Sequence, residues 1–159
     1  KQYRTINNLV GWITFIIAAT VYCMTIEPTE AFGTSPEFIT TGYKLEVGHP
    51  PGAPFFMLVA NYFQQFASDP APVAKMVNYM SALMSGACIL FPVLEHHASG
   101  SKLVATDENN ITKGQLITIM GSGLVGALAY TFSDTFWFSA VEGEVYAFSS
   151  LFTAVVILG

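Results

Sequence analysis

The sequence predicts an all-α membrane protein, a polytopic helix bundle with surface helices in its first extracytoplasmic loop. Charged residues make up only 11% of the chain, whereas a soluble domain carries about 25%. Hydrophobic residues account for 52%, and most of the few charges gather in three segments, at residues 1–4, 27–46 and 95–113. Long apolar stretches separate these segments, which is the arrangement of membrane spans and loops.

Four segments are predicted to span the membrane. Residues 8–26 carry no charge and approach the ~20 apolar residues that cross a hydrocarbon core of ~30 Å. A cleavable signal peptide is the alternative, but this run exceeds a signal's apolar region of ~7–15 residues, and no small-residue cleavage site follows it. Residues 74–94 and 114–133 are the next predicted spans. Residues 143–159 begin a fourth, which suggests a fragment of a longer chain.

The loop after the first span is predicted to face outward. Lys1 and Arg4 precede that span, so the positive-inside rule places the N-terminus in the cytoplasm. Residues 50–66 are apolar and aromatic but short for a span, so they could cross the membrane or lie along it. The second arrangement is favoured, which makes residues 27–73 one extracytoplasmic loop with surface helices.

Composition also bears on partners and packing. The net charge of −5 argues against nucleic acid, because no basic face is available to neutralise phosphates; membrane lipids are expected partners. Cys23 and Cys88 lie inside predicted spans without the spacing of a metal site or a redox pair, so we interpret them as packing residues. The small residues at 121–127 predict a close approach between helix backbones.

The first loop contains the first candidate catalytic residue. Ser35-Pro36-Glu37 is typical of a helix start, with Ser35 at the N-cap, Pro36 at the first helical position and Glu37 in the first turn. Glu37 could act as a general base at the membrane surface. It could equally do no more than complement the helix dipole.

The helix predicted after Glu37 is amphipathic and runs through Tyr43 and Lys44, with Lys44 near the stripe of Glu37. His49 follows, between a glycine and the Pro-Pro-Gly of residues 50–52. A histidine in such a loop could be a hydrogen-bonded structural residue, could bind a phosphate or could relay a proton.

Glu142 and Glu144 form a second candidate cluster where the last predicted span begins. Carboxylates beside hydrocarbon are costly and usually face a protein interior or a wet cavity. In the predicted orientation they lie on the same side as Glu37, so the carboxylates are expected to converge on one external cavity. Such a cluster suits acid–base chemistry, a divalent cation or cation transport; no residue is assigned as a metal ligand.

Two segments, AFGTSPEFITTGYKLEVGHPPGAPFF and FSDTFWFSAVEGEVYAFSSLF, resemble the N-terminal region of a bacterial family of multi-spanning membrane proteins of unknown function. That family is related to the transmembrane protein O-mannosyltransferases and is similar to the C-type glycosyltransferase superfamily. The resemblance implies the fold of the N-terminal part of such an enzyme. It also implies transfer of a sugar from a polyprenyl-phosphate donor to a protein or glycan hydroxyl on the extracytoplasmic side.

The resemblance further implies residue roles. In that superfamily an acidic residue of the first external loop deprotonates the acceptor hydroxyl. The family pattern before the glutamate is Trp-Asp-Cys-Gly, but residues 33–36 here are Gly-Thr-Ser-Pro, so Thr34 replaces the expected acid. Either Glu37 is the catalytic residue or this copy is inactive. Our hypothesis for substrate binding names Tyr43, Lys44, His49, Glu142 and Glu144, with Lys44 and His49 near the donor phosphate.

Two other function classes stay open at this stage. A transporter or channel segment could bind a cation through the external carboxylates, and a non-catalytic subunit of a membrane complex would need no donor. The expected location is the bacterial inner membrane, with a cytoplasmic N-terminus and the active side in the periplasm.

Overall fold

A computed structural model describes residues 2–29, 33, 35–49, 52–104 and 111–158. All regular structure in these residues is helical, with seven α-helices and no strand, so the predicted all-α class is confirmed. Thr34, on which the departure from the family pattern rests, lies outside the described residues.

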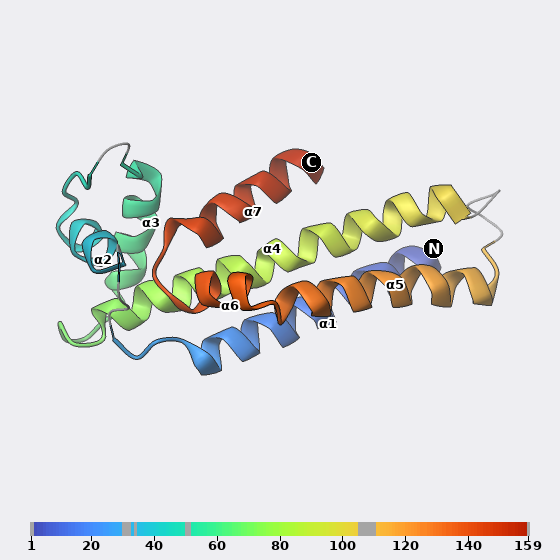
Figure 1. Cartoon of the computed structure of the whole chain (residues 1–159), viewed down its shortest axis with the longest axis horizontal. Coiled ribbons are helices and arrows are strands. Elements are labelled where there is room, and N and C mark those ends of the chain that lie inside the picture. Colours follow the sequence, from blue (N-terminus) through green and yellow to red (C-terminus); the bar gives the residue numbers. More distant parts are fainter. Residues whose placement is uncertain (1, 30–32, 34, 50–51, 105–110, 159) are drawn as a thin grey trace.

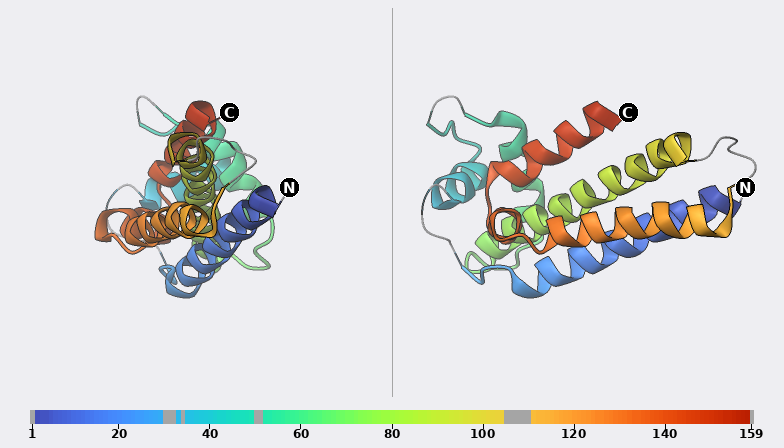
Figure 2. Two further views of the ribbon diagram at one scale, coloured as in Figure 1. Left: turned by 90° about the vertical axis from the view of Figure 1, so that its right-hand side faces the viewer. Right: turned by 45° about the vertical axis from the view of Figure 1, so that its right-hand side comes forward.

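Long helices form the body of the molecule (Figure 1). Helices α1 (Gln2–Thr25), α4 (Val73–Val104) and α5 (Lys113–Thr131) run side by side, and α7 (Val145–Leu158) lies along the first half of α4. A short helix, α6 (Asp134–Val141), follows α5 with a bend of 64° between their axes. Figure 2 shows the same bundle from two further directions.

Two described helices are long and apolar enough to cross a membrane, over Tyr3–Thr25 and Val73–His96, and α5 with α6 would make a third if the bent pair is one span. The predicted spans 8–26 and 74–94 lie on these first two helices. The predicted fourth span corresponds to α7, which has 14 residues, fewer than the ~20 needed to cross unaided. The exact membrane boundaries stay predictions.

Helices α1 and α4 approach each other through small residues. A Cβ added to Gly86 would lie 3.1 Å from Ala19 Cβ and 3.3 Å from Ala19 Cα, so a side chain there would require the two helices to shift apart by a few tenths of an ångström. Within the predicted close-packing stretch 121–127, Gly123 and Ala127 are buried, whereas no described atom is found within 4 Å of a Cβ added to Gly121 or Gly126.

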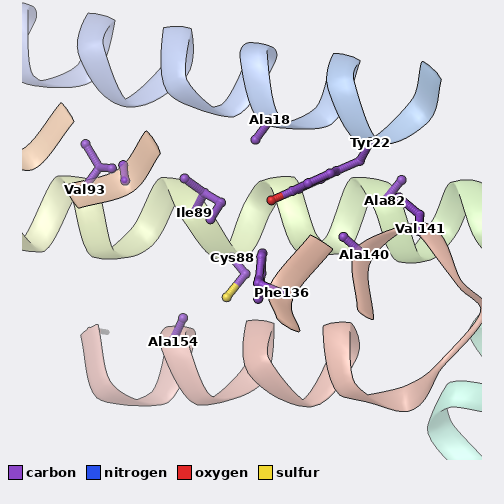
Figure 3. Packing of buried hydrophobic residues seen from close by; sticks show 11 residues of the cluster. Ala18, Tyr22, Ala82, Cys88, Ile89, Val93, Phe136, Ala140, Val141 and Ala154 are labelled. Carbon is purple, nitrogen blue, oxygen red and sulfur yellow. The ribbon is translucent and has the colours of Figure 1, made fainter. Parts of the chain in front are cut away.

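A buried cluster joins α1, α4, α5, α6 and α7 (Figure 3). Tyr22 reaches from α1 into this cluster, is fully buried, and donates its hydroxyl proton to the Thr131 carbonyl oxygen at 2.7 Å. Its ring also packs edge-on against Phe136 and Trp137 of α6. Because Thr131 is the last residue of α5, Tyr22 gives that terminal carbonyl a partner and fixes the point where α6 begins.

The first loop contains two helices, as predicted. These are α2 (Ser35–Lys44) and α3 (Pro54–Gln64), and they lie at the end of the bundle opposite the N-terminus (Figure 1). Helix α3 has 11 residues, too few to cross a hydrocarbon core. Phe38 of α2 packs against Phe56 of α3, and Phe56 packs against Phe148 of α7. These ring contacts pack α2 and α3 against the helix bundle.

Candidate functional site

Helix α2 presents Glu37 because its apolar residues face the other way. Phe38 and Ile39 are buried in a cluster with side chains of α3 and α4, whereas the Glu37 side chain remains 37% exposed. The helix begins at Ser35, one residue earlier than predicted. Ser35 is fully buried, and its hydroxyl has no hydrogen-bond partner among the described residues, so the predicted capping role is not observed.

Glu37 and His49 form a bidentate pair. The backbone N–H of His49 donates to Glu37 Oε1 at 2.6 Å, and the ring Nδ1 of His49 lies 2.7 Å from Glu37 Oε2. Gly48 makes this contact possible, since an added Cβ there would lie 3.2 Å from Glu37 Oε1 and 3.4 Å from the Met57 methyl group. The pair therefore joins the first turn of α2 to the loop that leads into α3.

Both contacts lower the pKa of the Glu37 carboxyl below its usual value. The larger effect comes from the His49 backbone N–H and the next from the His49 ring, because each stabilises the ionised carboxylate. An ionised carboxylate only accepts hydrogen bonds, so the Nδ1 of His49 carries the shared hydrogen. Glu37 is thus held as an anion with both oxygens engaged.

The C-terminal end of α2, which carries Tyr43 and Lys44, is held by a residue of α3. Asn61 of α3 donates from Nδ2 to the carbonyl oxygens of Gly42 at 3.0 Å and Tyr43 at 3.1 Å. The Tyr43 ring lines a shallow hollow of about 680 Å³. Lys44 is exposed and follows Glu37 by seven residues, or about 10 Å along a helix that rises 1.5 Å per residue.

A second group of candidate site residues, Glu27, Glu142 and Glu144, lies around the turn between α6 and α7. The Glu144 backbone N–H donates to the Glu142 carbonyl at 2.8 Å, and the Glu27 backbone N–H donates to the Val141 carbonyl at 3.2 Å. Glu144 is 8% exposed. The pKa of Glu142 is raised, first by desolvation and then by the charges of Glu144 and Glu27. The negative charges of Glu144 and Glu27 therefore disfavour ionisation of Glu142 at the point where the first loop leaves α1.

Asn78 and Gly143 hold this second group against α4. The fully buried Asn78 side chain donates from Nδ2 to the carbonyls of Glu27 at 2.8 Å and Thr29 at 3.1 Å. A Cβ added to Gly143 would lie 3.1 Å from Asn78 Oδ1 and 3.4 Å from Ser35 Oγ. The start of α2 therefore packs on the 142–144 turn, only two residues before Glu37.

Residues 34–159 match the family described as the N-terminal domain of protein O-mannosyl-transferase TMEM260. The chain belongs to this family. The matched region contains both the Glu37–His49 pair and the 142–144 turn, while α1 precedes it.

Two relatives bear names of this family. A protein of Dictyostelium discoideum named protein O-mannosyl-transferase tmem260 is 25% identical over 146 residues, which cover 91% of this chain and 16% of that protein. Its namesake from Mus musculus is 28% identical over 148 residues, covering 90% of this chain and 18% of that protein. The chain thus spans less than a fifth of either relative. No solved structure gives a significant match to it.

Within this TMEM260 N-terminal region, the structure brings together some of the predicted site residues. Glu37 meets His49, and Glu142 lies near Glu144. The expected convergence of all carboxylates on one external cavity stays a prediction. No set of three or more His, Cys, Asp or Glu side chains in the described part of the chain could hold a metal ion.

Sequence reasoning missed three contributors to the site. Glu27 was used only for topology, Gly48 only as a loop residue, and Asn78 was not singled out. Asn78 did carry a signal, because an amide inside a predicted span needs a partner. Glu27 and Gly48 offered none, since their roles depend on which segments fold against them.

An apolar hollow in the helix bundle lies away from both groups. It has a volume of about 780 Å³ and is lined by α4, α5 and α7. Its walls are mainly apolar, and none of the predicted site residues contributes to them. The candidate site therefore comprises the two groups near α2 and the 142–144 turn.

Proposed function

We propose that this chain is part of a glycosyltransferase that moves a sugar, mannose first among the candidates, from a polyprenyl-phosphate donor to a protein or glycan hydroxyl. Membership of the TMEM260 N-terminal family supports this proposal, as do the names of two relatives. Helices long enough to cross a membrane suit an enzyme whose donor is a lipid.

The Glu37–His49 pair is the observation that carries the proposal. Such a transfer needs a group that removes the acceptor proton while the phosphate leaves. A carboxylate and an imidazole in direct contact are a common form of that acid–base unit. We assign Glu37 to this unit in place of the acid that Thr34 replaces, with His49 as its partner.

The remaining predicted residues are assigned to substrate binding. An ammonium donates to phosphate oxygens, so Lys44 is placed on the donor side. Tyr43 is exposed at the end of the same helix. Glu142 and Glu144 are assigned to the wall of the acceptor cavity, where a divalent cation is a further candidate ligand.

We also propose that this end of the bundle faces the periplasm of a bacterium and that the N-terminus is cytoplasmic. Arg4 belongs to the first turns of α1, at the opposite end of the bundle from α2 and α3 (Figure 1). That separation agrees with the positive-inside rule.

The test is transfer from radiolabelled polyprenyl-phosphate mannose by the purified full-length protein and its Glu37→Gln variant. Wild-type protein should bind the donor and label an acceptor, and Glu37→Gln should remain folded but lose transfer. Glu46→Gln is the matched control, because Glu46 is an exposed carboxylate two residues beyond α2.

Three outcomes would count against the proposal. Full transfer by Glu37→Gln would remove that residue from the acid–base unit. Cation flux through proteoliposomes without any sugar donor would favour a transporter. Absence of donor binding, together with fixed partners after purification, would favour a structural subunit.

A further inference from the structure

We infer that His49 Nε2 is the atom that takes the acceptor proton, and that Glu37 is the positioning residue which holds the ring. This inference rests on the sugar transfer proposed above and assigns separate roles to Glu37 and His49. The acceptor O–H gives its proton to Nε2 while the oxygen forms a bond to the sugar's anomeric carbon. The bond from that carbon to the phosphate oxygen breaks, and its electron pair leaves with the lipid phosphate. His49 then returns its proton to solvent.

The geometry separates the two roles. Glu37 Oε1 accepts from the His49 backbone N–H, and Oε2 accepts from Nδ1, so both oxygens are already engaged. A carboxylate stabilised by two donors is a weak proton acceptor. In a neutral imidazole whose Nδ1 carries the hydrogen, Nε2 has the free lone pair. The ring nitrogen is therefore the available base.

The ring is also held in one place while remaining accessible. Its backbone is fixed on one side by Glu37 and on the other by the Gly52 N–H, which donates to the His49 carbonyl at 2.9 Å. The ring lies 6.1 Å from the Phe38 ring, and Phe38 is itself buried against Phe56. Yet the His49 side chain is 50% exposed, and Nε2 has no hydrogen-bond partner among the described residues. A base needs this combination of fixed direction and open access.

The surrounding charges leave this assignment intact. Other titratable groups on the parts of the chain between and after Glu37 and His49 are Tyr43 and Lys44 on α2, Glu46 beyond it, Tyr62 on α3, and Lys75 and Tyr79 in the first turns of α4. Within the described chain, the ion pair to the His49 ring comes from Glu37. Glu37 thus controls which ring nitrogen carries the hydrogen, a role distinct from contact with substrate.

The test compares His49→Gln, His49→Ala, Glu37→Gln and the double variant Glu37→Gln/His49→Gln in the full-length protein, with Glu46→Gln as the control. Loss of a general base lowers kcat by about 10²–10⁴-fold, and we expect this for His49→Gln with donor binding retained. Added imidazole should restore transfer to His49→Ala, because the freed space accepts the missing ring. The double variant should be no slower than His49→Gln, since Glu37 acts through His49.

Rescue by imidazole also separates catalysis from folding, because an unfolded variant cannot be rescued. The inference is overturned if His49→Gln keeps the wild-type kcat while Glu37→Gln loses it, which would make Glu37 the base. It is equally overturned if His49→Gln weakens donor binding at unchanged kcat, which would make His49 a phosphate ligand. Wild-type protein that transfers nothing from any lipid-phosphate sugar would refute the proposed function itself, a result distinct from either of these.

Discussion

Replacing Gly143 with alanine should weaken the packing between the start of α2, which carries Glu37, and the turn that carries Glu142 and Glu144. Gly143 lies in the turn between α6 and α7, where an added Cβ would stand 3.0 Å from Val77 Cγ1, 3.1 Å from Asn78 Oδ1 and 3.4 Å from Ser35 Oγ. All three neighbours are fully buried, so none can move aside into solvent. The new methyl group must therefore displace a helix or break a contact.

The loss of stability in Gly143→Ala can be estimated from the hydrogen bonds that Asn78 makes. Its amide donates to the carbonyls of Glu27 and Thr29, and each such bond contributes about 0.5–1.5 kcal/mol net. Overpacking by one methyl group in a close-packed site costs about 1–3 kcal/mol. If the new methyl group is accommodated by a shift of Asn78, the cost of overpacking and the cost of the lost hydrogen bonds are alternatives and are not added. We expect Gly143→Ala to lower the free energy of unfolding by about 2 kcal/mol.

The measurement is reversible unfolding of the detergent-solubilised protein, followed by tryptophan fluorescence. Gly126→Ala is the matched control: Gly126 lies within α5, with no described atom within 4 Å of an added Cβ. Alanine in place of glycine within a helix should leave stability unchanged or raise it by up to about 1 kcal/mol. The reasoning is refuted if Gly143→Ala unfolds within about 0.5 kcal/mol of wild type, the range of a neutral surface change, or if the control loses as much.

Two further perturbations probe the packing around the site. Tyr22→Phe removes the hydroxyl that donates to the Thr131 carbonyl and leaves that buried oxygen without this partner, so the free energy of unfolding should fall by about 1–3 kcal/mol; an unchanged value in the same unfolding assay would contradict the contact. Glu142→Gln should act in the opposite direction. Because the pKa of Glu142 is raised in the folded state, its ionised form lowers stability once the pH exceeds the usual carboxyl range. The variant should thus be more stable than wild type at pH 7, and the gain should vanish below about pH 4, where the carboxyl is protonated in both states. A less stable variant at pH 7 would show that Glu142 is stabilised by a partner.

Much of the helical architecture could be predicted from local sequence. The uncharged run at residues 8–26 and the apolar run at 74–94 indicated α1 and α4, because length and composition alone decide whether a segment can cross a membrane. The Ser-Pro-Glu start indicated α2 to within one residue. The bend between α5 and α6 was not predicted, although Ser133 and Asp134 are residues typical of the start of a new helix. It depends on Tyr22 and the ring cluster that hold the end of α5.

The candidate site was only partly predictable for a related reason. Sequence reasoning selected Glu37 and His49 separately, one as a base and the other as a phosphate ligand or proton relay. Their contact, twelve residues apart, requires the loop between them to fold back on the first turn of α2. Gly48 permits that return by its lack of a side chain, and a lone glycine in a loop gives no indication of the carboxylate it will meet.

The sequence by itself determined an all-α chain with apolar helices of spanning length and an acidic, aromatic first loop, because these properties depend on composition and on short-range periodicity. The tertiary structure alone decided which polar groups meet. Asn78 reaches Glu27 across 51 residues, and Tyr22 reaches Thr131 across 109. Such contacts follow from how the long helices pack, and a buried polar atom must then bond with whatever group that packing brings within reach.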